Sequence, residues 1–207
     1  MRFFRLPVLI LSAVLAGPAA AQDAPATTGP SAANPSPPPS APMSVESPQA
    51  TQDKLLADLK RERDPDKAKQ LAQQILVNWS SSGSATVDLL MEWANKSIND
   101  KKNAAALDFL DRVTLLQPDY PEVFNRRATL YYTMGDTRKS MADVQRVLAL
   151  EPRYFPAIAG LASILTEGGQ DELALKAWER FLAIYPAERT AQENMLKLSE
   201  KLAGSRT

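Results

Sequence analysis

The chain has 207 residues, 44% of them hydrophobic, and its 24 basic residues equal its 24 acidic residues in number. Histidine and cysteine are absent, which removes the commonest general base, a strong nucleophile and the usual ligands of transition metals. The sequence therefore predicts no enzyme, no catalytic residue, no metal site and no cofactor, and it lacks the basic charge that would attract a nucleic acid.

Residues 1–21 have the pattern of a cleavable signal peptide. Arg2 and Arg5 precede a short apolar segment, Leu6 to Ala16, and Ala19 to Ala21 are small residues of the kind found at cleavage sites. The apolar segment is shorter than the about 20 residues that a spanning helix needs, so an uncleaved anchor is the less favoured alternative. We expect a periplasmic or fully secreted protein with no membrane span after cleavage.

Residues 22–50 are predicted to be a disordered linker. Eight of the sixteen prolines lie here among alanine and serine, and Asp23 and Glu46 are the only charged residues. This composition cannot form a core and favours an extended chain. A spacer toward the cell wall, or a ligand for a proline-binding partner, is the functional alternative to a simple leader.

Residues 51–86 predict a pair of helices. Leu55, Leu56 and Leu59 share one face of the first, and an apolar stripe from Ala68 to Trp79 marks the second. Asp64-Pro65 between them is typical of a helix start. We interpret the pair as a divergent repeat that extends the array that follows.

Three blocks of equal length come next, at 87–120, 121–154 and 155–188. Prolines and alanines recur at the interval of one block, at Pro118, Pro152 and Pro186 and at Ala94, Ala128 and Ala162. The second half of each block carries an apolar stripe with helical spacing, at Ala106, Leu110 and Val113, at Ser140, Val144 and Val147, and at Ala174, Trp178 and Phe181. A fixed period of this length predicts two-helix units that stack on one another.

The blocks resemble the tetratricopeptide (TPR) repeat. The middle block matches best, through Phe124, Ala128, Tyr131, Gly135-Asp136, Ser140, Val147 and Pro152. Three positions depart from the pattern: Ser97 replaces an aromatic residue, Lys101 a turn glycine, and Arg127 a packing leucine. The resemblance implies an all-α, right-handed solenoid of antiparallel helix pairs, with residues 189–207 as a capping helix.

Arg127 shares a packing column with Trp93 and Leu161. We expect its stem to be buried and its guanidinium to pair with Asp111 or Asp136, which would seal the junction between repeats. The alternative is that Arg126 and Arg127 together bind an acidic group of a partner.

The resemblance also implies a binding groove on the concave face, which the first helices line. The predicted groove residues are Met91, Asn95, Ile98, Asn125, Arg126, Thr129, Tyr132, Ser163 and Thr166. This row is polar and nearly uncharged, which suits the backbone of a bound protein or peptide. For each residue taken alone, an ordinary solvated helix face is the alternative. Some TPR domains hold a terminal carboxylate with lysines, but Met91 and Pro156 occupy those positions here.

Signal, linker and repeats together resemble periplasmic TPR proteins of Gram-negative, especially alphaproteobacterial, cells that are linked to envelope integrity. The resemblance implies a non-enzymatic adaptor that presents its groove to an envelope protein or an unfolded secretory client. The alternative is an accessory subunit of a cell-wall enzyme or of a secretion complex.

Overall fold

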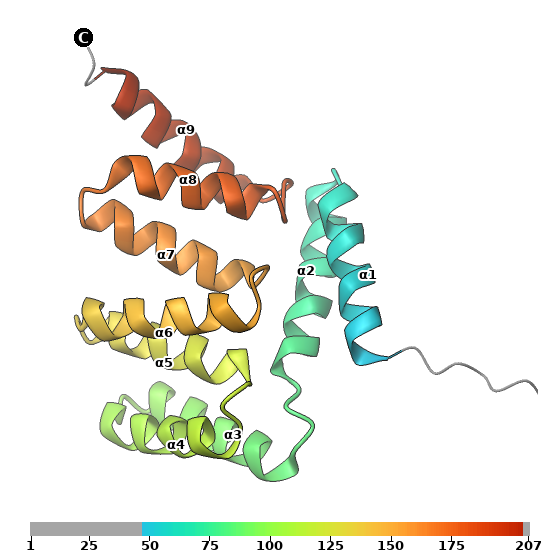
Figure 1. Cartoon of the computed structure of the whole chain (residues 1–207), viewed down its shortest axis with the longest axis vertical. Coiled ribbons are helices and arrows are strands. Elements are labelled where there is room, and N and C mark those ends of the chain that lie inside the picture. The colour runs from blue at the N-terminus through green and yellow to red at the C-terminus, as the bar shows by residue number, and fades with distance from the viewer. Residues whose placement is uncertain (1–46, 205–207) are drawn as a thin grey trace, which may run out of the picture. The chain divides into compact units, whose positions relative to one another are not determined.

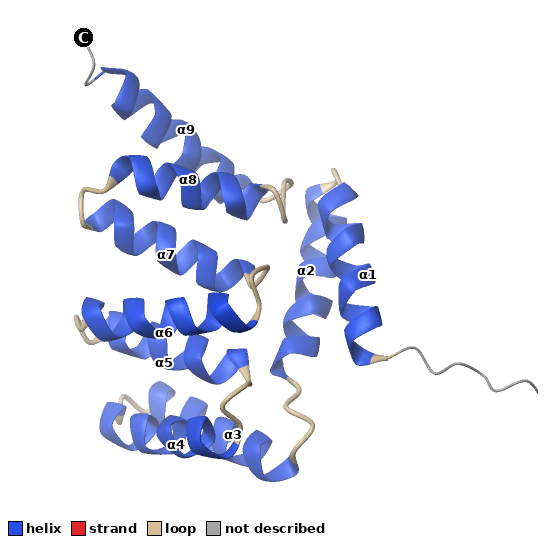
Figure 2. Cartoon of the chain, in the orientation of Figure 1, coloured by secondary structure: helices blue, strands red, loops and turns tan. Residues whose placement is uncertain are grey.

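The computed structural model describes residues 47–204, which form a right-handed all-α solenoid (Figure 1). The predicted signal peptide, the predicted linker as far as residue 46, and residues 205–207 lie outside the described residues. Figure 2 shows the described part as helices joined by short loops. The helices are α1 (Pro48–Arg61), α2 (Pro65–Ser80), α3 (Ala85–Asn99), α4 (Asn103–Leu116), α5 (Pro121–Thr133), α6 (Thr137–Leu150), α7 (Phe155–Glu167), α8 (Asp171–Leu182) and α9 (Arg189–Gly204). Within residues 47–204, no helix combines the length and the apolar character that crossing a membrane requires.

The stack consists of three antiparallel pairs, α3 with α4, α5 with α6 and α7 with α8. Each second helix also packs on the first helix of the next pair, and α9 packs on α8 as the terminal helix. Most of the predicted packing columns are buried, because large and small side chains alternate between facing helices. The buried columns are Leu90, Phe124 and Ile158; Ala94, Ala128 and Ala162; and the nine residues of the second-helix stripes.

The turns inside the three pairs share one backbone conformation. Lys101, Gly135 and Gly169 have φ angles of 57°, 80° and 69°, in the left-handed region. After each of them the next backbone N–H donates to the carbonyl five residues earlier, at 2.8 to 2.9 Å. This bond closes the end of the first helix. The turn is therefore kept in the first repeat, although a lysine occupies the position that glycine holds in the other two.

The α1–α2 hairpin does not extend the stack by packing on α3 in the way that the interpretation as a divergent repeat requires. Instead α2 packs beside α5, and the Trp79 ring stacks on Tyr154 in the turn after α6, with 4.3 Å between ring centroids. The Tyr120 hydroxyl, in the turn after α4, donates to the Ser80 carbonyl at 2.7 Å. The hairpin therefore lies along the turns between repeats (Figure 1).

The first helix of the hairpin is held by its N-cap, by an ion pair to the repeats and by a shared core. The helix α1 begins inside the predicted linker because the Ser47 hydroxyl accepts a hydrogen bond from the Ala50 N–H and caps it. Asp53 on α1 then forms a 2.8 Å ion pair with Arg153 in the turn after α6. The apolar side of the hairpin shares one core with α7, α8 and α9, through Leu56, Leu59, Ala68, Ala72 and Ile75.

Candidate partner-binding groove

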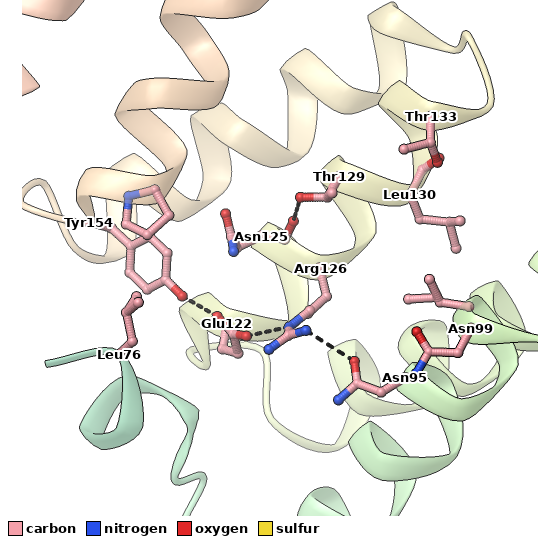
Figure 3. Close-up of a pocket in the computed structure, with 12 residues that line it drawn as sticks. Leu76, Asn95, Asn99, Glu122, Asn125, Arg126, Thr129, Leu130, Thr133 and Tyr154 are labelled. Carbon is pink, nitrogen blue, oxygen red and sulfur yellow. Dashed lines mark hydrogen bonds and ion pairs between the residues drawn. The ribbon is translucent and has the colours of Figure 1, made fainter. Parts of the chain in front are cut away.

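A groove of about 550 Å³ lies on the face formed by the first helices of the first two repeats (Figure 3). The α3 side contributes Asn95, Ile98 and Asn99, and most of the remaining lining comes from α5. Leu76 of α2 borders it because the hairpin lies beside α5, and Tyr154 borders it from the turn after α6. The groove is thus built by the repeats and bordered on one side by the N-terminal hairpin.

A buried carboxylate, that of Glu122, binds both Arg126 and Tyr154 at the edge of the groove. Glu122 is 6% exposed, and it accepts hydrogen bonds from the Tyr154 hydroxyl and from Nε of Arg126. Nη1 of Arg126 also donates to Oδ1 of Asn95 at 3.3 Å, which joins α5 to α3 (Figure 3). Burial, followed by the charge of Glu122, raises the pKa of Tyr154. The guanidinium of Arg126 balances the charge of the Glu122 carboxylate, while the Arg126 side chain stays 43% exposed to the groove.

Three asparagines supply uncommitted amides. Within residues 47–204, the side chains of Asn99 and Asn125 make no hydrogen bond, and Asn95 uses only its oxygen. The Thr129 hydroxyl beside them donates to the backbone carbonyl of Asn125 at 2.9 Å. A carboxamide can donate and accept at the same time, as a peptide bond does. The groove can therefore pair with the backbone of an extended chain without a matching charge.

Most of the predicted groove residues lie along one continuous surface. Asn95, Ile98, Asn125, Arg126 and Thr129 line the main groove. A smaller hollow of about 160 Å³ between α5 and α7 shares Asn125 and Thr129 with it and adds Tyr132 and Ser163. A third hollow, of about 380 Å³ between α7 and α9, is lined by Ser163 and Thr166. Tyr132 also bridges two repeats, since its hydroxyl donates to Glu167.

Met91 is the exception, because it is 7% exposed and packs in the core instead of facing the groove. The flexible thioether of methionine fills gaps in a core readily. Met91 is therefore buried, whereas Asn125, at the same position of the next repeat, is half-buried. Sequence reasoning also missed Glu122, Tyr154 and Leu76. Glu122 could have been found, because it lies four residues before Arg126 on the predicted helix and this spacing favours an ion pair. Leu76 depends on where the hairpin lies, and Tyr154 on how the turn after α6 meets the start of α5.

Arg127 lies outside the groove, in the junction between α4, α5 and α6. Its guanidinium binds Asp143 through two bonds of 2.7 Å and Asp111 through a third of 2.7 Å. The two bonds to Asp143, more than the single bond to Asp111, hold the pKa of Arg127 above its usual range. The expected pairing with Asp111 is present, but Asp136 instead caps α6 through the Lys139 N–H. Joint binding of an acidic group by Arg126 and Arg127 does not fit this geometry, because their guanidinium groups serve different sites.

Comparisons with known proteins agree with this architecture. A family profile described as tetratricopeptide repeat matches residues 160–187. A TPR repeat-containing protein of Rhizobium etli is 59% identical over 161 residues, which cover 78% of this chain and 79% of that protein.

Solved structures share the fold. The first TPR domain of Spaghetti (RPAP3), solved bound to the HSP90 peptide SRMEEVD, is 25% identical with a TM-score of 0.54 and covers 58% of this chain and 95% of that one. The MamA protein is 16% identical with a TM-score of 0.51, covers 74% of this chain and 81% of its own, and supports the fold alone. The chain belongs to the tetratricopeptide repeat family and is built as a scaffold for protein interactions.

Proposed function

We propose that this protein is a non-enzymatic periplasmic adaptor, and that it holds an extended segment of a cell-envelope protein across the groove between α3 and α5. The observation that carries the proposal is the convergence of the Asn95, Asn99 and Asn125 amides on one groove of about 550 Å³. Ile98 and Leu76 add apolar contact at its edges. Such a lining binds peptide backbone through amides and one or two side chains through apolar contact.

Two further observations support a protein ligand. The Spaghetti (RPAP3) domain, which is similar over 58% of this chain, was solved with a bound peptide. In the groove itself Glu122 is already paired with Arg126, so no strong unbalanced charge is present to demand a highly charged partner. The residues of the groove can hold a peptide through amides and apolar contact without catalysing a reaction, which is what an adaptor requires.

The periplasmic location is supported by the signal-like pattern at residues 1–21. We expect the exported protein to begin at Gln22. Fractionation of the native cells, followed by mass spectrometry of the N-terminal peptide, tests this directly. Recovery of the intact N-terminus from the cytoplasmic fraction would refute the location while leaving the groove open to test.

Photo-crosslinking in living cells tests the groove. A photoreactive amino acid at Thr129, which is exposed and lines two of the hollows, should capture a defined envelope protein. The control position is Lys176, which is exposed on α8 and lies outside the residues that line the groove. Adding Asn125→Ala to the Thr129 variant should reduce the adduct, because the amide would no longer hold the peptide backbone.

The outcomes separate the candidate functions. Capture of one protein at Thr129 and not at Lys176 supports the groove. Equal capture at both positions, or at Lys176 alone, rules the groove out as the working surface. Should the captured protein be a cell-wall enzyme or a secretion component whose activity depends on this chain, the adaptor role gives way to that of an accessory subunit.

A further inference from the structure

The stack has an open end at α3 and α4, and this end exposes an apolar face. Leu89 and Trp93 lie one helical turn apart on α3, and each is 44% exposed. The Trp93 ring also contacts the ring of Phe109 on α4, with 5.6 Å between centroids. We refer to Leu89, Trp93 and Phe109 as the α3 end face. The sequence predicted that Trp93 would be a packing residue, and among residues 47–204 no helix covers it on this face.

The repeats themselves show what normally covers such a face. Counting one repeat onward each time, Leu89 aligns with Val123 and then with Ala157, which are 0% and 1% exposed. In those repeats the preceding second helix provides the cover, since α4 packs on α5 and α6 packs on α7. The same position is therefore buried wherever a second helix precedes it and exposed in the first repeat.

The neighbouring position leads to the same conclusion. Trp93 aligns with Arg127, whose Nη1 reaches back to Oδ1 of Asp111 on the preceding α4 at 2.7 Å. A side chain at this position of a first helix thus contacts the helix that precedes its own repeat. In the first repeat, α2 would be that helix, but it packs beside α5 and on Tyr154.

We propose that the α3 end face is a second docking surface, occupied by an amphipathic helix of a partner protein that packs on α3 as α4 packs on α5. The continuity of the stack supplies the geometry, since two intact copies of this interface lie directly behind it. The chemistry differs at Trp93. Because Trp93 stands where Arg127 stands in the next repeat, the incoming helix needs an apolar residue where α4 has Asp111. This surface is separate from the groove and does not depend on it.

A peptide from the chain itself provides the probe. A labelled peptide of residues 102–117 that carries Asp111→Leu reproduces the helix that covers α5, adapted to Trp93. Titrated with the full mature protein, it should bind, gain helicity and shift the tryptophan fluorescence to shorter wavelength as the Trp93 indole is buried. The unchanged peptide, with Asp111, should bind about tenfold more weakly, because its carboxylate would face the Trp93 ring without a cation.

Matched variants locate the binding. Leu89→Lys and, separately, Trp93→Lys should each weaken binding of the Asp111→Leu peptide by about tenfold or more. Both residues are half-exposed, so the variants should keep the helical circular dichroism of the parent. Leu173→Lys on α8 is the control, since Leu173 is 49% exposed and lies outside the face. Asn125→Ala, which alters the groove, should leave peptide binding unchanged.

Three results would overturn the proposal. The first is an absence of binding by the parent protein, and the second is binding that Leu89→Lys and Trp93→Lys leave unchanged. The third is a dimer in sedimentation equilibrium that Leu89→Lys dissociates, because a second copy of this chain would then be the occupant. Selective loss of peptide binding in both variants of a monomeric protein would support it.

Discussion

Arg127 on α5 and Asp143 on α6 are joined by two parallel charge-assisted hydrogen bonds, Nε to Oδ2 and Nη2 to Oδ1, each 2.7 Å long. The side chain of Asp143 is 9% exposed and that of Arg127 is 18% exposed. In the third repeat the aligned residues are Leu161 and Ala177, which shows that an apolar pair also fits this junction. The same position of the repeat is thus filled by an ion pair in the second repeat and by two apolar residues in the third.

The first prediction concerns this pair. Arg127→Leu should lower the free energy of unfolding by about 3 kcal/mol, because it leaves the carboxylate of Asp143 buried without a cation. The double variant Arg127→Leu with Asp143→Ala should recover most of that loss, since it copies the third repeat. Urea denaturation of the three proteins measures both effects. Unchanged stability of the single variant, together with lost partner binding, would show that Arg127 serves a partner instead of the junction.

The second prediction concerns the turn of the first repeat. Lys101→Gly should raise the free energy of unfolding by about 1 kcal/mol, because a residue with a Cβ pays for the left-handed conformation that glycine adopts freely. Gly135→Ala is the matched reverse change and should lower it by about 1 kcal/mol. No atom lies within 4 Å of a Cβ added at Gly135, so the effect there is one of backbone conformation. Thermal unfolding of both variants provides the measurement, and a change of the same sign in both would contradict it.

The third prediction concerns Gln52 on α1, which is 5% exposed. Neither its amide nitrogen nor its amide oxygen has a hydrogen-bond partner within residues 47–204. Gln52→Leu keeps a similar volume and removes two buried polar atoms, so it should stabilise the protein by about 1 kcal/mol. Gln73→Leu, at an exposed position of α2, should have no measurable effect. A destabilised Gln52→Leu protein would mean that the amide is satisfied by a bound group.

The fourth prediction is a loss of stability in alkali. Burial, followed by the charge of Glu122, raises the pKa of both Tyr120 and Tyr154. The neutral phenols are favoured in the folded chain, so their contribution is complete below the ordinary tyrosine pKa and declines above about pH 10. The melting temperature should therefore fall steeply there. Tyr120→Phe should melt lower at neutral pH, because it loses the bond to Ser80, but its decline in alkali should be shallower. Equal slopes in the two proteins would refute this explanation.

The stack was predictable from the sequence because its packing recurs at one fixed interval. A buried position such as Ala94 recurs at Ala128 and Ala162, and each copy supports the assignment of the others. Five of the residues that the same periodicity assigned to the groove line one hollow of the structure, and their role in binding stays a prediction. Arg127 was harder, because Asp111 and Asp143 both lie 16 residues from it and sequence distance does not separate them. Asp143 becomes its partner when α6 folds back along α5.

The hairpin could not be placed from the sequence. Residues 81–84 connect α2 to α3 over the same length as 117–120, which connect α4 to α5 in the regular stack. The difference lies in conformation, because Gly83 takes a φ of 75° and the first connection has no proline. The aromatic surface that attracts Trp79 exists only once the turns carrying Tyr120 and Tyr154 are aligned. The position of the hairpin therefore depends on residues that only the folded repeats bring together, and no local sequence pattern predicts it.

The position of the hairpin also changes how the array should fold. In a simple solenoid each repeat contacts only its neighbours, so the repeats can fray one after another. Here the ion pair of Asp53 with Arg153 and the stacking of Trp79 on Tyr154 both join the hairpin to the turn that ends the second repeat. These long-range contacts couple the second and third repeats to the N-terminal helices, and they should slow folding. Because these contacts and a shared core hold the hairpin against the repeats, the second and third repeats should lose their structure together with the hairpin and not one after another.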